Sequence, residues 1–201
     1  MPVTKTLLRA LPLVALFAAA VAFAQEAPDA MVKRVSQEVL DIARSDPKVQ
    51  AGDQARIHEV VDAKLAPHFD FAHMTALAMG RNWRAASPAQ QQELTEQFKQ
   101  LLVRTYSGAL SRYRDEKLEY KPLALDPGAT EVTVKTLVIR SGGGTPVSID
   151  YSLAKTPQGW KAYDIIVGGV SLVTNYRDEF NEQIKAGGID GLIKTLKAKN
   201  G

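Results

Sequence analysis

The residues best suited to acid–base chemistry are one aspartate and two tyrosines in the C-terminal half of the chain. Asp164 follows Tyr163 in the stretch GWKAYDIIV, and Tyr151 lies in the preceding stretch VSIDYSLAK. A carboxylate beside phenols on the inner face of a curved sheet could transfer a proton, as in ketosteroid isomerases. A lone acid without a second base at a recognisable spacing is, however, more typical of a structural carboxylate. We expect Asp164 to accept hydrogen bonds from backbone N–H groups or to pair with an arginine such as Arg177.

Metal and nucleophile chemistry find little support. The three histidines, His58, His68 and His73, include one pair five residues apart, and this step does not place two imidazoles on one helix face as a step of four does. We therefore expect the histidines at solvated loop positions and predict no metal site. The chain has no cysteine, which excludes thiol catalysis, and it contains neither a Gly-x-Ser-x-Gly elbow nor a nucleotide-binding glycine pattern.

Nucleic-acid binding is not favoured either. Arg81, Trp83 and Arg84 could stack on bases or bind an anion, but two arginines around one tryptophan more often form a packed corner with the guanidinium groups at the surface. Arg177 and Asp178 similarly suggest a salt-bridged helix face. The full chain carries 25 basic and 22 acidic side chains without any block of like charges. We predict no nucleic-acid partner.

The first 24 residues have the composition of an export signal. Lys5 and Arg9 precede the apolar run ALPLVALFAAAVAF, and Ala22-Phe23-Ala24 supplies the small-x-small pattern that signal peptidase recognises. The apolar run is shorter than the about 20 residues of a comfortable membrane span. We predict cleavage after Ala24 and one exported domain over residues 25–201, whose 23 basic and 22 acidic side chains give a net charge of +1.

Helical spacing of apolar residues predicts several helices in the first half of the mature chain. A first helix begins near Pro28, and a second follows the tripeptide AGD. Asp70 is a plausible N-cap for a short helix, FAHMTALAM, which Gly80 ends. The tetrapeptide SPAQ at residues 87–90 is a capping box with proline at the first helical position, and a long helix should follow it to about Arg114.

After residue 115 the apolar period changes from 3.6 to 2, which predicts strands joined by short turns and therefore an antiparallel meander. The last strand shows no clean alternation. Gly168-Gly169 should break it and start a helix at Val170, and Gly187-Gly188 should divide the C-terminal helical part in two. The chain is thus predicted to be an α+β domain with N-terminal helices, a four-stranded twisted antiparallel sheet and C-terminal helices. The four predicted strands span residues 118–125, 130–140, 147–155 and 160–167.

Three stretches closely resemble the MlaC family of periplasmic phospholipid-binding proteins, also known as toluene-tolerance proteins. They are FDF at 69–71, MGRNWRAASPAQQQELTEQFKQLLVRTYSGAL at 79–110 and GWKAYDIIVGGVSLVTNYRDEF at 159–180, and the match runs in order through residues 31–196. The family motifs Gly-x-x-Trp-Arg-x-x-Ser-x-x-Gln, Trp-Lys-x-Tyr-Asp and Gly-Val-Ser-Leu-Val-x-Asn-Tyr-Arg are all present.

The resemblance implies a shuttle that carries a glycerophospholipid across the periplasm, without catalysis or cofactor, and so helps to maintain the lipid asymmetry of the outer membrane. Its partners would be an inner-membrane ABC-type complex with a ring of MCE domains and an outer-membrane lipoprotein associated with porins. The resemblance also implies a twisted antiparallel sheet wrapped by helices, with the acyl chains in an apolar pocket between them. Gly168-Gly169 would then form a sharp corner at the edge of the pocket.

The predicted lipid contacts are apolar residues on faces of the sheet and of the long helix that should converge. They are Phe98, Leu102, Tyr106, Val134, Val138, Ile149, Tyr151 and Ile165. Two other classes of protein stay open: a cone-shaped isomerase-like enzyme that uses Asp164, and a ligand-free periplasmic adaptor. They stay open because periodicity alone does not distinguish a filled core from one that encloses a lipid-sized cavity.

Overall fold

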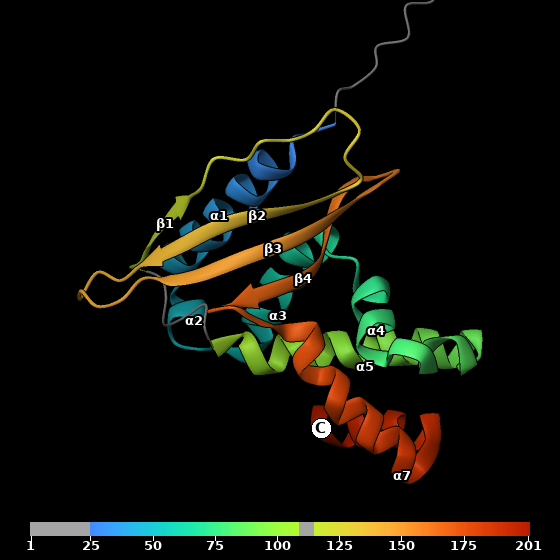
Figure 1. Cartoon of the computed structure of the whole chain (residues 1–201). Helices are drawn as coiled ribbons and strands as arrows, with labels where there is room; N and C mark the ends of the chain where they lie inside the picture. Colours follow the sequence, from blue (N-terminus) through green and yellow to red (C-terminus); the bar gives the residue numbers. More distant parts are fainter. Residues whose placement is uncertain (1–24, 109–114) are drawn as a thin grey trace, which may run out of the picture.

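The sheet is an antiparallel meander of five strands, one more than the sequence predicts. The computed structural model describes residues 25–108 and 115–201. Each strand pairs antiparallel with its neighbour along the chain (Figure 1). The strands are β1 (Lys117–Tyr120), β2 (Glu131–Ile139), β3 (Val147–Thr156), β4 (Gly159–Val167) and β5 (Val170–Ser171). The α+β class and the meander are therefore confirmed, and the strand count is corrected.

The additional strand comes from the two glycines that the sequence analysis expects to end the sheet. Gly168 and Gly169 have φ values of 57° and 84°, and they form a two-residue turn that returns the chain from β4 into the short β5. Positive φ at both central positions is typical of hairpin turns that match the strand twist, and glycine adopts it without steric cost. The following helix consequently begins at Leu172 rather than at Val170, with Ser171 as its N-cap.

The helices lie before and after the sheet in the sequence, as predicted. Asp70 caps the short helix by accepting a hydrogen bond from the His73 N–H, and the capping box at residues 87–90 is formed. The predicted end of the long helix near Arg114 lies outside the described residues. The helices are α1 (Pro28–Ser45), α2 (Pro47–Gln50), α3 (Gln54–Val60), α4 (Phe71–Met79), α5 (Pro88–Tyr106) and α7 (Leu172–Asn200), with a π-helical turn at Val61–Leu65 and 3-10 turns at Ala66–His68 and Gly80–Ala85.

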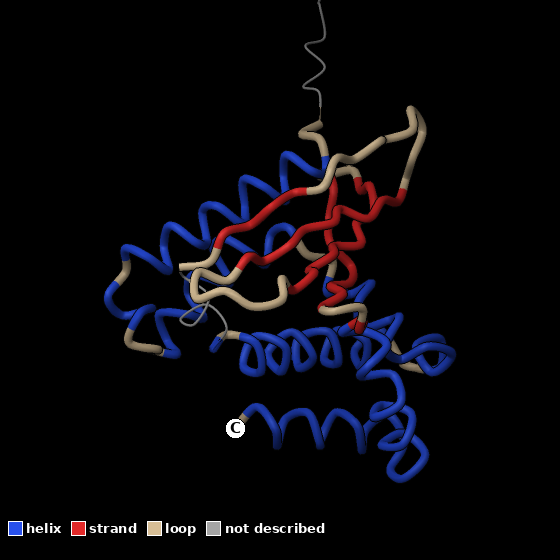
Figure 2. The backbone as a smooth tube through the Cα atoms, turned by 60° about the vertical axis from the view of Figure 1, so that its left-hand side comes forward, coloured by secondary structure: helices blue, strands red, loops and turns tan. Residues whose placement is uncertain are grey.

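The helices form separate apolar cores rather than one. α1 runs along one face of the sheet, behind it in Figure 1, and packs Met31, Val32 and Val35 against that face. α4, α5 and α7 lie beneath the sheet (Figure 2) and enclose a core of their own. A third core joins the C-terminal half of α1 to α2, α3 and α5.

The side of the sheet on which α1 packs is called the α1 face below. Strand register places on it almost only apolar side chains, because residues paired across an antiparallel ladder point to the same side. From β2 to β5 the apolar ones are Val132, Val134, Val138, Val147, Ile149, Tyr151, Leu153, Trp160, Ala162, Ile165, Val167 and Val170, and Thr136 and Lys155 are the polar ones.

A bulge in β4 explains why this strand shows no clean alternation in the sequence. Leu153 pairs with Ala162, whereas the adjacent Ser152 pairs with Asp164, so Tyr163 is an extra residue in the ladder. Ala162 and Ile165 therefore both lie on the α1 face although they are three positions apart. Asp164 lies on the opposite face of the sheet.

The break in the C-terminal helix predicted at Gly187-Gly188 is confirmed as a kink in α7 at Gly188. Its φ of 68° and ψ of −172° fall in a region that is essentially restricted to glycine and costs other residues about 1–3 kcal/mol. Gly187 has no positive φ, and a Cβ at either position would meet nothing within 4 Å.

We expect Gly188→Ala to lower the free energy of unfolding by about 1–3 kcal/mol, measured by urea denaturation, because only the backbone conformation opposes the methyl group. Gly187→Ala is the matched control. It should be neutral or stabilising by up to about 1 kcal/mol, since alanine is the better helix former. Equal destabilisation by both substitutions would contradict the backbone explanation.

Candidate functional site

Asp164 is held at the junction of β4 and α7 by two hydrogen bonds. Its carboxylate accepts one from the Ser171 hydroxyl at 2.5 Å and one from the Val173 backbone N–H at 3.2 Å. The side chain is buried. Val173 lies in the first turn of α7, where N–H groups without helical partners and the helix dipole favour a negative charge. Asp164 therefore caps α7 from the neighbouring strand.

Arg177 does not act as the ionic partner that the sequence analysis expects for Asp164. Its Nε donates to the carbonyl oxygen of Leu77 at 3.0 Å, close to the C-terminal end of α4. Carbonyl groups at a helix end lack intrahelical donors, so a cationic side chain is a favourable partner there. Arg177 thus ties α7 to α4 rather than to the acid on β4.

The aspartate and the two tyrosines do not converge on one site. Tyr151 points to the α1 face and Asp164 to the opposite face. Burial raises the pKa of Tyr151 to about 12, and burial likewise raises the pKa of Tyr163, whose ring stacks on His73 with centroids 4.5 Å apart. A general acid or base must reach the proton it transfers and must titrate near the working pH. Tyr151 and Asp164 lie on opposite faces of the sheet, and the pKa values of both tyrosines are raised, so the three residues do not form one acid–base site.

We expect Asp164→Ala to lower the melting temperature by roughly 5–10 °C, because it removes a charge-assisted cap and leaves a buried N–H without an acceptor, a loss of about 2–3 kcal/mol. Asp164→Asn keeps one acceptor oxygen and should lower the melting temperature less than Asp164→Ala does. Scanning calorimetry of the two variants checks the order. An Asp164→Ala protein as stable as the parent chain would refute the capping role.

The other polar candidates are dispersed, and the expectation that the histidines occupy solvated loops is wrong. All three are half-buried, with His58 in α3 and His73 in α4. Within the described ranges no group of three or more His, Asp or Glu side chains could hold a metal ion. Trp83 packs against the core of α4, α5 and α7 while Arg81 and Arg84 are exposed, which confirms the packed corner.

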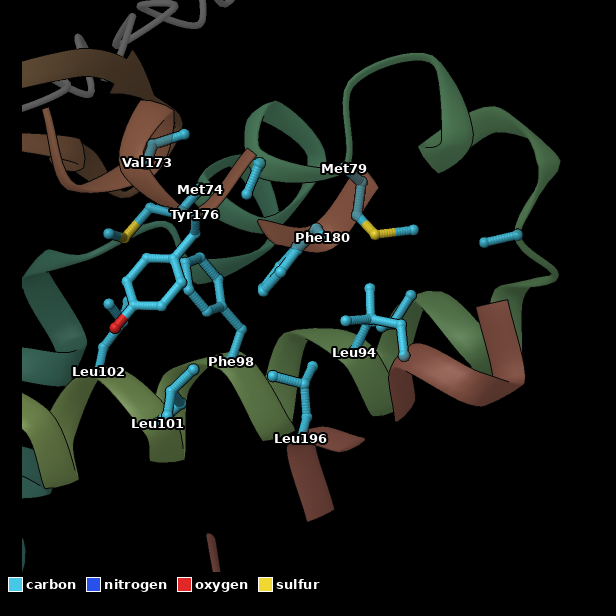
Figure 3. Packing of buried hydrophobic residues seen from close by; sticks show 13 residues of the cluster. Met74, Met79, Leu94, Phe98, Leu101, Leu102, Val173, Tyr176, Phe180 and Leu196 are labelled. Carbon is cyan, nitrogen blue, oxygen red and sulfur yellow. The ribbon is translucent and has the colours of Figure 1, made fainter. Parts of the chain in front are cut away.

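Two predicted contacts from the long helix, Phe98 and Leu102, lie inside the core of α4, α5 and α7 (Figure 3). Phe98 is fully buried, and its ring meets those of Tyr176 and Phe180 edge-on, with centroids 5.1 and 5.0 Å apart. The third helix candidate, Tyr106, ends α5 and is 39% exposed. Burial raises the pKa of its phenol, and a hydrogen bond with Tyr176 acts in the same direction.

The five candidates from the strands all lie on the α1 face. Alternation predicts this for the four in the second and third strands, whereas Ile165 reaches the face because of the bulge in β4. Val134 and Val138 are buried, and Val134 packs in the core beneath α1 together with Tyr151. Ile149, Tyr151 and Ile165 are only half-buried. The structure therefore brings the strand candidates together on one surface and packs Phe98 and Leu102 in a different core.

Two apolar residues that continue the α1 face were missed in the sequence. Val167 pairs with Val170 across the Gly-Gly turn, and the two are 37% and 59% exposed. A pair of valines flanking Gly-Gly is a recognisable hairpin signal, but the second strand is only two residues long and reads as the start of a helix.

Two surface hollows lie away from the predicted lipid contacts. One hollow of about 610 Å³ lies beside Ile42 and Arg56, and one of about 790 Å³ lies beside Trp83 and Glu96. Neither is lined by any of the eight predicted lipid contacts. Among the helices of the described part of the chain, none has the length and apolar character needed to cross a bilayer.

Comparison with known proteins decides the family. A model of the MlaC protein family matches residues 33–198, most of the chain. This chain belongs to the MlaC family. The family resemblance inferred from the three sequence stretches is thereby confirmed.

Two curated relatives align with most of this chain. The toluene tolerance protein ttg2D of Pseudomonas putida is 25% identical over 86% of this chain and 80% of its own length. The intermembrane phospholipid transport system binding protein MlaC of Haemophilus influenzae is 20% identical over 88% of this chain and 83% of its own length.

One solved structure similar to this chain contains a ligand. The phospholipid-binding protein from Ralstonia solanacearum, in complex with a phospholipid, is 39% identical to this chain with a TM-score of 0.80. The similarity covers 86% of this chain and 96% of that one. The α+β fold is thus shared with a protein that holds a phospholipid.

Proposed function

We propose that this protein is a periplasmic phospholipid carrier. The observation that carries the proposal is its 39% identity, over 86% of this chain, to the Ralstonia solanacearum protein in complex with a phospholipid. The name of the Haemophilus influenzae relative, an intermembrane phospholipid transport binding protein, supports the same role. The predicted signal would direct export and would then be cleaved after Ala24.

The acyl chains are proposed to lie against the part of the α1 face that α1 leaves accessible. Half-buried apolar side chains suit a ligand that completes their burial, and Ile149, Tyr151 and Ile165 have this character. Tyr106 would contribute from the end of α5. Of the buried candidates, Val134 and Val138 would lie behind the chains on the α1 face, and Phe98 and Leu102 would support the helices from their own core.

Binding by burial requires no catalytic residue. At about 0.8 kcal/mol per buried CH₂, two acyl chains could contribute on the order of 20 kcal/mol of gross transfer free energy. A bilayer offers the lipid nearly the same gain, so moving a lipid between protein and membrane is close to an even exchange. We propose as partners an inner-membrane ABC-type complex with an MCE-domain ring and an outer-membrane lipoprotein–porin complex.

Native mass spectrometry of the protein purified from the periplasm of a Gram-negative host tests the function. We expect a mature chain that begins at Gln25 and carries glycerophospholipid, identified after solvent extraction. A chain that is purified without lipid and takes none from phosphatidylethanolamine vesicles would refute the carrier. The adaptor class would then be favoured.

A further inference from the structure

Exposed apolar side chains mark one edge of the sheet. Among the described residues the large apolar side chains that are exposed are Tyr106, Leu125, Val167 and Val170, and Val170 has the largest exposed fraction at 59%. Two of the four flank the turn between β4 and β5. Edge strands of soluble proteins usually carry charged or otherwise protective residues, because apolar edges favour association. The sequence Val-Gly-Gly-Val at this edge has no such protection.

The two valines end a continuous apolar row that crosses the sheet. Thr136, Ile149, Val167 and Val170 are paired in succession from β2 to β5, so they lie side by side on the α1 face. Exposure rises along the row: Thr136 is 1% exposed, Ile149 is half-buried, Val167 is 37% exposed and Val170 is 59% exposed. The hydroxyl of Thr136 donates to the carbonyl oxygen of Ile149 at 2.6 Å, so it does not interrupt the apolar surface.

The exposed end of the row is fixed by hydrogen bonds on both sides of the turn. The Gly168 N–H donates to the carbonyl oxygen of Ser148 at 2.9 Å. On the other side, Ser171 donates to Asp164 and caps α7 by accepting from the Thr174 N–H at 3.0 Å. The position of Val170 is therefore set by the fold, and its exposure is built into the hairpin.

We propose that an acyl chain enters and leaves the protein over the β4–β5 edge, with Val170 as its outermost contact and Val167 as the next. The inference rests on the proposed carrier function and adds the route to it. A chain that slides along an unbroken apolar surface exposes few of its methylenes to water at any moment. The row from Val170 to Ile149 provides such a surface between solvent and the half-buried part of the α1 face.

If this route is used, a charge at its outer end should slow lipid exchange without changing how much lipid the protein holds at equilibrium. In Val170→Asp, a charged group stands at the outer end of the row while Ile149, Tyr151 and Ile165 are unchanged. We expect exchange of a fluorescent acyl-labelled phospholipid between protein and phosphatidylcholine vesicles to slow by about tenfold. The amount of phospholipid held at equilibrium should stay at the level of the parent chain.

Leu125→Asp is the matched control, because Leu125 is also exposed, at 41%, and lies in the loop between β1 and β2, away from the row. It should exchange lipid at the rate of the parent chain. This result would show that the slowing depends on where the charge lies and not only on its being added. Val170→Asn, polar but neutral, should show a smaller slowing in the same direction. Circular dichroism confirms that the variants are folded, which the exposure of both positions favours.

Different results would refute the proposed entry route and the proposed carrier function. A parent chain that takes up no phospholipid from vesicles refutes the proposed function itself. A loaded Val170→Asp protein that exchanges at the parental rate, or a Leu125→Asp protein that is slowed equally, refutes the route and leaves the carrier intact.

Discussion

Ile149→Glu is expected to leave the protein folded but to reduce its bound phospholipid at least about tenfold. Ile149 is half-buried on the α1 face, in the centre of the row between Thr136 and Val167. An ionised carboxylate beside an acyl chain would lose hydration without gaining a partner, and this cost opposes binding. Because the residue is partly accessible, the new side chain can turn toward solvent in the lipid-free protein. Phosphorus assay after solvent extraction measures the lipid per mole of chain.

Ser148→Glu is the matched control for this substitution. Ser148 is the preceding residue, is also half-buried and points to the opposite face of the sheet. It introduces the same charge into the same strand, so its lipid content should remain that of the parent chain. If both variants kept their lipid, the α1 face would not be the binding surface; if both lost it, the effect would come from damage to β3.

Val134→Glu is a poorer test of the same surface although Val134 is also a candidate contact. It is 1% exposed and packs beneath α1 with Met31 and Val32. A carboxylate at this position has neither water nor a partner. Burying such a charge can cost as much free energy as the whole net stability of a domain, which is about 5–15 kcal/mol. Loss of lipid in Val134→Glu would therefore report unfolding rather than binding.

The sheet was largely predictable because its signal is local. Alternation in the second and third strands assigns Val134, Val138, Ile149 and Tyr151 to one face, and the pairing places them there. The first strand ends at Tyr120 rather than at residue 125, since Pro122 follows within two residues and cannot donate to a ladder. The short β5 could not be read from period, because two residues contain no repeat.

The site was less predictable because a helical stripe shows that a residue is buried without showing what buries it. Periodicity correctly places Phe98 and Leu102 on an inward side of α5. The partners that fill the space around Phe98, Tyr176 and Phe180, come from α7, about 80 residues further along the chain. Three-dimensional packing, which no local pattern encodes, therefore decides that Phe98 faces other aromatic rings rather than the α1 face of the sheet.

Because of this packing, we expect Phe98→Ala to destabilise the fold more than any other substitution considered above, except the buried charge of Val134→Glu. The residue is fully buried with aromatic neighbours on two sides, and removal of such a ring typically costs about 3–5 kcal/mol through lost burial and the cavity left behind. For a chain of this size the melting temperature should fall by roughly 10 °C or more. Gln92→Ala, at an exposed position of the same helix, should change it little.

The lipid content of Phe98→Ala shows whether the Phe98 ring only supports the helices or also touches the acyl chain. If the ring supports α7 from within the helical core, the folded protein below its melting temperature should hold as much phospholipid per mole as the parent chain. A ring that touches the acyl chain would instead show a clear loss of lipid in protein that is still folded. Extraction of lipid from the folded fraction, isolated by gel filtration, measures this directly. We expect unchanged lipid, since both edge-on contacts of Phe98 are with rings of α7.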